Sequence, residues 1–322
     1  MIRRQAGAEL CAVCDTDAAA LVAARADFAD VACFGELADM LAAPLRLDVV
    51  CICTPNGYHA EQSIAALRAS VHVVCEKPMA LRRVDCEAVI FEALQRSRHV
   101  FCVMQNRYSP PAQWLKSMIE QERLGRILMV EINCYWNRDE RYYRPNGQPH
   151  AWKGTQGLDG GTLFTQFSHF IDVLYWLFGD IDQITARFAN HTHADYLPFE
   201  DSGTVLFRLQ RDGAQGVLTY STSVFERNME SSLTIIGTQG SIKVGGQYMN
   251  EVEYCHVKDY VFEPLPAAAP ANDYGHYKGS AANHHFVIQN VVDTLLQRCQ
   301  ISTNALEGLK VVDIIERIYA AG

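Results

Sequence analysis

The sequence predicts an α/β protein in two parts: a parallel sheet covered by helices over residues 1–104, and an α+β region with a large, mainly antiparallel sheet over residues 105–322. Three observations predict this class. Short apolar strands alternate with helical segments up to residue 104, strands follow one another after residue 180, and glycine-containing turns join these later strands. Alternating strands and helices are typical of parallel sheets, whereas strands joined by tight turns are typical of antiparallel ones.

The composition is typical of a globular protein with two domains, since 49% of the 322 residues are hydrophobic and 20% are charged. The formal charge of −9 argues against nucleic acid as the main partner. No apolar run approaches the roughly 20 residues that span a bilayer, and no signal-peptide pattern follows the basic N-terminus. We therefore expect a cytoplasmic protein that binds neither nucleic acid nor membrane.

Eleven cysteines do not form a spaced disulfide framework in a chain of this length. Cys11 and Cys14 match a C-x-x-C pattern, but they lie in a predicted strand, where residues i and i+3 point to opposite faces. Neither redox chemistry nor zinc binding is favoured there. We expect no metal site in this chain.

The first part alternates apolar strands with helices along its whole length. The strands are rich in β-branched residues, which favours strands buried on both faces. We predict strands at 8–14, 32–34, 48–53, 71–75 and 100–104, and helices at 17–26, 36–42, 60–68 and 84–96.

The second part begins after Tyr108-Ser109-Pro110-Pro111, where the alternation stops. We predict helices at 112–122, 163–178, 286–298 and 305–320, and strands at 127–137, 184–188, 203–209, 216–223, 231–236 and 240–244. The segment Pro264–Pro270, made mostly of proline and alanine, is the best candidate for a surface loop. We expect the second part to bind substrate and to form oligomers, and its last helices to pack back on the first part.

Asp15 follows the first predicted strand. In a dinucleotide-binding fold, an acidic residue at the end of the second strand binds the adenosine ribose and favours NAD over NADP. Asp15 could equally cap the next helix. The glycine-rich turn belongs about 20 residues before this acid, and the chain begins too close to Asp15 to hold it. We therefore expect an N-terminally truncated Rossmann-type parallel sheet domain, without its first strand and glycine-rich loop.

Two further motifs follow strands of the first part. Thr54-Pro55-Asn56-Gly57-Tyr58-His59 comes after strand 48–53, at the edge where doubly wound sheets bind their ligands, although such a turn is also common without a ligand. Lys77 follows strand 71–75 and is held between Glu76 and Pro78. Partial burial or a neighbouring cation would lower its pKa and suit it to proton exchange. The alternative is a solvated loop lysine.

His169 and Asp172 are predicted to share one face of helix 163–178, with Thr165 one turn earlier. A carboxylate beside a histidine orients its ring and supports its protonation, as a general base requires. The pair Gly160-Gly161 before the helix permits close approach of a ligand. A histidine in a buried helix is also commonly a core residue, so both interpretations stay open.

The segment 137–153 departs from the overall acidity, with four cations against two carboxylates. Aromatic residues lie in it or beside it. Guanidinium groups beside aromatic rings suit a diphosphate and a flat base, whereas the alternative is a solvated loop. The cations are Arg138, Arg141, Arg144 and Lys153, and the aromatic residues are Tyr135, Trp136, Tyr142, Tyr143 and Trp152.

Together these motifs resemble the Gfo/Idh/MocA family of nucleotide-dependent sugar oxidoreductases, over nearly the whole chain. Four middle segments look like the branch of that family that oxidises the carbon 3 hydroxyl of UDP-N-acetylglucosaminuronic acid-type sugars in surface polysaccharide biosynthesis. Thr165 stands where many family members carry Asp, which leaves only Asp172 near the histidine. The segments are Gln105–Tyr108, Cys134–Arg138, Leu158–Asp172 and Gly245–Tyr248.

The resemblance implies an NAD-dependent enzyme in which Lys77 and His169 act as the acid/base pair at the reacting hydroxyl, with Asp172 beside them. The cofactor contacts that it implies are Asp15, Thr54, Pro55, Asn56, His59, Glu76, Lys77 and Lys153. The substrate contacts that it implies are Gln105, Arg107, Asn137, Arg138, Thr165 and His169.

Two other functions stay open at this point. One is a dehydrogenase of an uncharged sugar or of inositol, which solvent-facing Arg138, Arg141 and Arg144 would favour. The other is a cofactor-free chain without catalysis. By analogy at the level of the fold, we also expect a homo-oligomer, a dimer or tetramer, formed through the antiparallel sheet.

Overall fold

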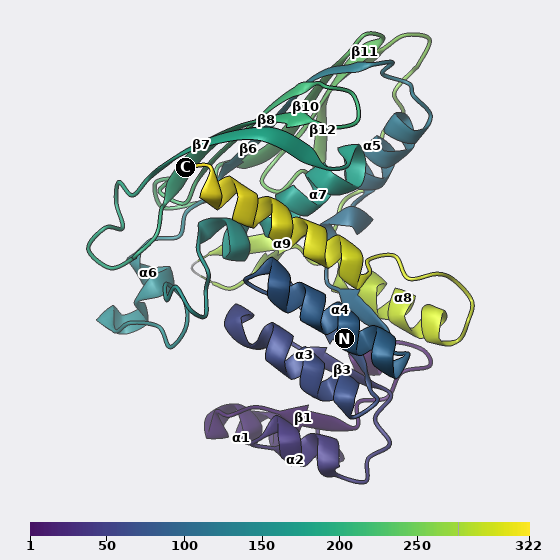
Figure 1. Ribbon diagram of the computed structural model, residues 1–322, viewed down its shortest axis with the longest axis vertical. Helices are drawn as coiled ribbons and strands as arrows, with labels where there is room; N and C mark the ends of the chain where they lie inside the picture. Colours follow the sequence, from purple (N-terminus) through teal and green to yellow (C-terminus); the bar gives the residue numbers. More distant parts are fainter. Residues whose placement is uncertain (276) are drawn as a thin grey trace.

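A computed structural model describes residues 1–275 and 277–322. Figure 1 shows short parallel strands with their helices at one end of the molecule and a large sheet at the other. The helix α9, Ala305–Ala320, runs between them. The fold is therefore the predicted combination of a parallel sheet with a larger, mostly antiparallel one.

The first part contains five short parallel strands with helices between them. Asp17 caps the first helix, because its side chain accepts the backbone N–H of Ala19 at 2.8 Å. The strands are β1 (Ala12–Cys14), β2 (Ala32–Phe34), β3 (Val49–Ile52), β4 (His72–Cys75) and β5 (Val100–Cys102). The helices are α1 (Ala18–Asp27), α2 (Leu37–Ala42), α3 (His59–Arg68) and α4 (Arg83–Arg96), with single 3₁₀ turns at Ile2–Arg4 and Asn56–Tyr58.

The parallel strands form two separate sheets. β1 pairs with β2, and the three other strands pair in the order β3-β4-β5. A cavity of about 1000 Å³ lies between the two sheets, lined by residues of both β1 and β3 and by apolar side chains of a C-terminal helix, among them Val291 and Leu295. In the part of the chain that the structure describes, no strand fills this gap.

The second part is built on a seven-stranded sheet in the order β12-β11-β10-β6-β9-β8-β7. Neighbouring strands are antiparallel except β6 and β9, which run parallel, so the sheet is mixed. The helix α5 (Pro110–Glu120) precedes it. The strands are β6 (Ile127–Tyr135), β7 (Ile181–Ala189), β8 (Ser202–Leu209), β9 (Gln215–Ser221), β10 (Glu230–Gly237), β11 (Gly240–Gly245) and β12 (Glu251–Val257).

The sequence analysis missed β12, a short hairpin of β13 (Ala271–Asp273) and β14 (Lys278–Ala281), and the one-turn helix α6 (Glu140–Tyr143). β12 is an edge strand whose residues are mostly exposed, and the alternation of Glu251-Val252-Glu253-Tyr254 was the signal that could have revealed it.

The helix predicted at 163–178 has two parts. Leu163–Phe167 is a π-helical turn, and Ser168–Phe178 is the α-helix α7. Nearly every residue of this stretch is buried. A π-helical turn changes the register between side chains before and after it, so Thr165 does not stand one regular α-turn before His169.

The two C-terminal helices join the two parts of the molecule. Val287 and Val291 of α8 (His284–Leu295) pack against Val74, Phe101 and Val103 of the first part. α9 lies against α4 and β5 on one side and against α7 and β7 on the other. No helix among the described residues is long and apolar enough to cross a membrane.

Candidate active site

The carboxyl ends of β3 and β4 face the start of the π-helical turn. Lys77 follows β4, and its Nζ donates a hydrogen bond to the Thr165 carbonyl at 2.7 Å. Asn56 follows β3, and its Nδ2 donates to the Thr165 hydroxyl and to the Asp159 carbonyl, both at 2.8 Å. Thus the fold brings together three motifs that lie far apart in the sequence.

Asp159, which the sequence analysis did not select, is the carboxylate at the centre of this arrangement. It is 1% exposed. Its side chain accepts hydrogen bonds from the Thr165 hydroxyl and from the Gly154 N–H, the latter at 2.7 Å. Burial raises the pKa of Asp159, while these hydrogen bonds and the charge of Lys77 oppose the shift. Its place directly before Gly160-Gly161 was the signal that could have revealed it.

Lys77 has the electrostatic environment of a proton-exchanging group. Burial lowers its pKa, and the nearby Arg138 lowers it further, while Glu76 and Asp159 oppose the shift. The resulting pKa lies below the ordinary lysine value. The amine is fixed by its hydrogen bond to Thr165.

His169 is buried on α7 and lies beside Gln105, with 3.2 Å between His169 Nε2 and Gln105 Nε2. The two nitrogens are within hydrogen-bonding distance, and the direction of this bond depends on the tautomer of the ring. Nδ1 has no hydrogen-bond partner among the described residues. Burial lowers the pKa of His169 well below its ordinary value, and Lys77 and His284 lower it further. The ring is therefore neutral and able to accept a proton.

The structure differs from the sequence analysis at Asp172 and Arg107. Asp172 was expected beside the His169 ring, and Arg107 was expected to face the substrate. Instead the two form a bidentate ion pair, at 2.6 and 2.8 Å, and Arg107 also donates to Glu307 of α9 at 2.6 Å. Both side chains are at most 4% exposed. All three donating nitrogens of the guanidinium are thus committed to carboxylates, and this pair connects elements of the fold.

His59 likewise serves the fold where a cofactor contact was expected. Its Nδ1 lies 2.7 Å from the Pro78 carbonyl and its Nε2 lies 2.7 Å from the Thr54 carbonyl. The buried ring therefore bridges the loops that follow β3 and β4. Pro55 and Asn56 lie in the loop after β3, and Asn56 is occupied by Asp159 and Thr165.

The carboxyl ends of the parallel strands carry polar groups of the kind that bind a dinucleotide. Asp15 directly follows β1 and is exposed, and Glu76 follows β4. Thr54 follows β3, and its hydroxyl donates a hydrogen bond to the Gln62 side chain. Burial raises the pKa of Glu76, but His284 and Lys77 together outweigh it, so the pKa is lowered and Glu76 is ionised. In a dinucleotide-binding fold, a carboxylate in the position of Asp15 can hydrogen-bond the adenosine ribose of NAD. Among the described residues, the stretch before β1 holds no glycine-rich turn and helix N-terminus to receive a pyrophosphate.

A group of cations and aromatic rings lies near Lys77, and Arg138 of this group lowers the Lys77 pKa. Arg138 is 2% exposed, and its guanidinium lies 4.8 Å from the ring centres of Trp136 and Tyr277. The Lys153 amine lies 4.3 Å from the Tyr142 ring. Arg138 donates only to neutral groups: the Gln166 and Asn228 side chains and the Asn137 and Lys278 carbonyls.

Asn137, expected as a substrate contact, and the other two arginines of this segment are placed differently from one another. The Asn137 Nδ2 donates to the Val224 carbonyl at 2.7 Å, so that amide is used within the fold. Arg141 and Arg144 are 53% and 36% exposed and pair with Asp139 and Glu140. The single buried cation of the arginine trio is therefore Arg138.

His284, the first residue of α8, was also missed. Its Nε2 lies 3.5 Å from Glu76, directly before Lys77. Ser280, just upstream, accepts a hydrogen bond from Gln105 at 3.0 Å. The signal was weak, because the predicted helix began at residue 286 and left His284 in a loop.

Comparisons with known proteins find matches over both parts of the chain. Residues 1–104 match the model of an oxidoreductase family with an NAD-binding Rossmann fold, and residues 112–243 match the GFO/IDH/MocA C-terminal domain. A crystal structure of the WlbA dehydrogenase from Bordetella pertussis, in complex with NADH and UDP-GlcNAcA, is 32% identical with a TM-score of 0.86, over 99% of this chain and 91% of that one.

Two curated relatives carry other names. A 1-carboxy-3-chloro-3,4-dihydroxycyclohexa-1,5-diene dehydrogenase of Comamonas testosteroni is 31% identical over 52% of this chain, and an inositol 2-dehydrogenase of Salmonella paratyphi B is 32% identical over 54%. The chain spans 40% and 48% of the lengths of these two relatives.

Proposed function

The chain belongs to the GFO/IDH/MocA oxidoreductase family, and from that premise we propose that it is an NAD-dependent dehydrogenase of a UDP-linked sugar acid. The reaction is oxidation of the carbon 3 hydroxyl of a UDP-N-acetylglucosaminuronic acid-type sugar. The solved structure of the similar WlbA dehydrogenase contains NADH and UDP-GlcNAcA, which supports this choice. A place in surface polysaccharide biosynthesis stays a prediction.

The observation that carries the proposal is the charge of the site. Lys77 and Lys153 both interact with the carboxylate of Asp159, and Arg138 lies close enough to the two lysines to lower their pKa values. Arg138 is buried and forms no ion pair with any described carboxylate. A buried cation without a counter-charge is costly, and an anionic ligand would lower that cost. A sugar acid supplies the negative charge, whereas an uncharged polyol does not.

The chain's own groups can perform the proton chemistry. Neutral His169 accepts the proton of the reacting hydroxyl. The ammonium group of Lys77, held by the Thr165 carbonyl, stabilises the alkoxide that develops. Asp15, Thr54 and Glu76 would hold NAD along the carboxyl ends of the strands. When bound, NAD supplies the acceptor for the carbinol hydride.

The test is NADH formation with a set of matched substrates. The purified chain is incubated with NAD and, separately, UDP-N-acetylglucosaminuronic acid, UDP-N-acetylglucosamine and myo-inositol, and NADH absorbance is followed. We expect turnover with the sugar acid alone. Oxidation of UDP-N-acetylglucosamine, whose sugar lacks the carboxylate, or of myo-inositol at equal or greater kcat/KM would contradict the proposal. Failure of the folded chain to bind NADH would favour the non-catalytic alternative.

Two arginine variants isolate the role of charge. Arg138→Gln removes the buried cation, whereas Arg141→Gln removes an exposed one that is already paired with Asp139. We expect the first to raise the KM for the sugar acid by at least tenfold, since a charge-assisted hydrogen bond contributes about 1.5–3 kcal/mol. The second should change it by less than about twofold.

A second candidate is a dehydrogenase of another sugar or of inositol. Arg141 and Arg144 point to solvent, as this alternative predicts, and an inositol 2-dehydrogenase is among the relatives. The buried position of Arg138 is the observation against it. The substrate set separates the two candidates directly.

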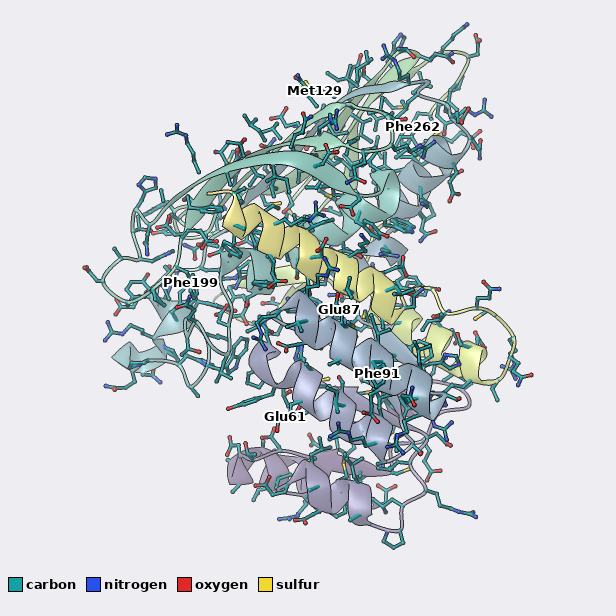
Figure 2. The ribbon with its side chains drawn as sticks, viewed as in Figure 1. Glu61, Glu87, Phe91, Met129, Phe199 and Phe262 are labelled. Atoms are coloured by element: carbon teal, nitrogen blue, oxygen red, sulfur yellow. The ribbon has the colours of Figure 1, made fainter. Side chains whose placement is uncertain are left out.

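We also propose that the chain forms a homo-oligomer through the outer face of its large sheet. The helices α5, α7 and α9 cover the other face (Figure 1). Met129 lies on the outer side (Figure 2) and is 41% exposed; Leu206 and Ile236 are 55% and 39% exposed. Such apolar side chains on an uncovered face favour a second copy as the partner.

The oligomer proposal is tested by molar mass in solution. Light scattering after size exclusion should give a multiple of 36.1 kDa, and Leu206→Asp should convert it to the monomer. A monomeric unmodified chain would exclude this interface.

We further propose a cytoplasmic location, because all eleven cysteines are free, two of them exposed, as in reducing compartments.

A further inference from the structure

Glu200 is a buried carboxylate outside the proposed active site. It lies two residues before β8 and is 8% exposed. Two tyrosine hydroxyls donate to its Oε1: Tyr319 of α9 at 2.7 Å and Tyr220 of β9 at 3.1 Å. The three residues come from distant parts of the sequence, and none was selected by the sequence analysis.

This group contacts the chain that leads into the π-helical turn. The Leu163 N–H donates to the Tyr319 oxygen at 3.1 Å, and the Thr162 hydroxyl donates to the Glu200 carbonyl. Gly161 has φ +124°, and a Cβ placed there would lie 2.6 Å from the Tyr319 hydroxyl. The tyrosine therefore packs directly on the glycine turn, and only a residue without a side chain fits beneath it.

The same turn is connected to the proposed acid/base lysine. The Thr165 N–H donates to the Gly161 carbonyl at 3.1 Å, and the Thr165 carbonyl accepts the Lys77 amine at 2.7 Å. Hydrogen bonds thus link Glu200 to Tyr319 and Tyr319 to Leu163, the backbone leads from Leu163 to Thr165, and a further hydrogen bond links Thr165 to Lys77.

We propose that Tyr319 and Glu200 are positioning residues for the dehydrogenase reaction, holding residues 161–163 so that the Thr165 carbonyl stays within reach of Lys77. The inference deepens the proposed function and rests on it for the role of Lys77. Neither residue touches Lys77. Their effect passes through the backbone, where a loose turn would let the carbonyl move away from the amine.

The substitution Tyr319→Phe tests this, because it removes one hydroxyl and leaves the Leu163 N–H without its acceptor. We expect the looser turn to lower kcat about tenfold. The KM values for NAD and the sugar should change by less than about twofold. A carbonyl that accepts from an ammonium favours its charged form, so the alkaline limb of the pH profile should move to lower pH.

Tyr220→Phe is the matched control. It removes the other hydroxyl from Glu200 but leaves the Leu163 contact in place, so its kcat and pH profile should stay within about twofold of the unmodified enzyme. Equal losses in both variants would mean that the carboxylate's burial, and not the contact with the turn, matters. Unchanged kcat and pH profile in Tyr319→Phe would overturn the proposal.

A direct titration of Lys77 makes the test independent of turnover. The ¹³Cε resonance of Lys77, assigned with Lys77→Arg, is followed against pH in both tyrosine variants. The Lys77 pKa should be lower in Tyr319→Phe than in the unmodified chain and unchanged in Tyr220→Phe. An identical Lys77 titration in Tyr319→Phe refutes the inference even if no sugar is oxidised, whereas a shifted titration without turnover counts only against the proposed function. If Tyr319→Phe does not fold, Thr162→Val removes the second link and should shift the titration in the same direction.

Discussion

Among single side chains, Lys77 is the one whose loss we expect to reduce turnover most. Its amine is fixed by the Thr165 carbonyl, and burial and Arg138 lower its pKa. Lys77→Ala should reduce kcat by about 10²–10⁴-fold, the range that acid/base groups contribute, while circular dichroism and the melting temperature stay close to those of the unmodified chain. Retained turnover would remove Lys77 from the mechanism.

Glu200 gives a second prediction at the scale of one residue. Burial raises its pKa from 4.5 to about 7. Between these values the unfolded chain has released this proton and the folded chain has not, so Glu200 makes the free energy of unfolding fall as the pH rises. The loss is about 3 kcal/mol, complete above pH 7. In Glu200→Gln, the free energy of unfolding measured with urea at several pH values should not show this fall. If both proteins show the same pH profile, the shift is absent.

At the scale of elements, Arg107 and Asp172 connect the 3₁₀ turn Gln105–Tyr108 to α7, and Glu307 connects them to α9. Asp172→Asn leaves a buried guanidinium without its bidentate partner, which costs about 3–5 kcal/mol of unfolding free energy. Asp85→Asn, in an exposed pair with Arg82, is the control and should cost far less.

The same variant separates the two interpretations of Asp172. If Asp172 serves the fold, the His169 titration measured by NMR should be unaltered in Asp172→Asn, provided that the variant stays folded. A small loss of stability together with a displaced His169 pKa would restore the role expected from the sequence.

Sequence reasoning succeeded where the signal is local. The helix 305–320 and the strand 32–34 have the predicted bounds, because apolar periodicity and, for the helix, the Asn304 and Glu307 capping box lie within one stretch of chain. It failed where a side chain has a choice of partners. Spacing placed Asp172 near His169, but only the fold reveals that Arg107 offers a bidentate partner.

At the scale of the whole molecule, the divided parallel sheet predicts uneven protection. β1 is paired on one side only and belongs to a two-stranded sheet, whereas β4 lies between β3 and β5. Two-stranded sheets are marginally stable on their own. Hydrogen exchange with mass spectrometry should therefore find faster exchange in peptides covering β1 and β2 than in those covering β4. Equal protection would mean that the two sheets open as one unit.

The position of the C-terminal helices in the chain determines when the first part can be covered during synthesis. Val287 and Val291 of α8 cover Val74, Phe101 and Val103, and the Thr303 N-terminal to α9 pairs with Cys102 at the edge of β5. In the chain, α8 begins about 180 residues after the end of β5. Until α8 has been translated, the face of the parallel strands that carries Val74, Phe101 and Val103 is uncovered. We expect chaperones to bind this apolar face during synthesis.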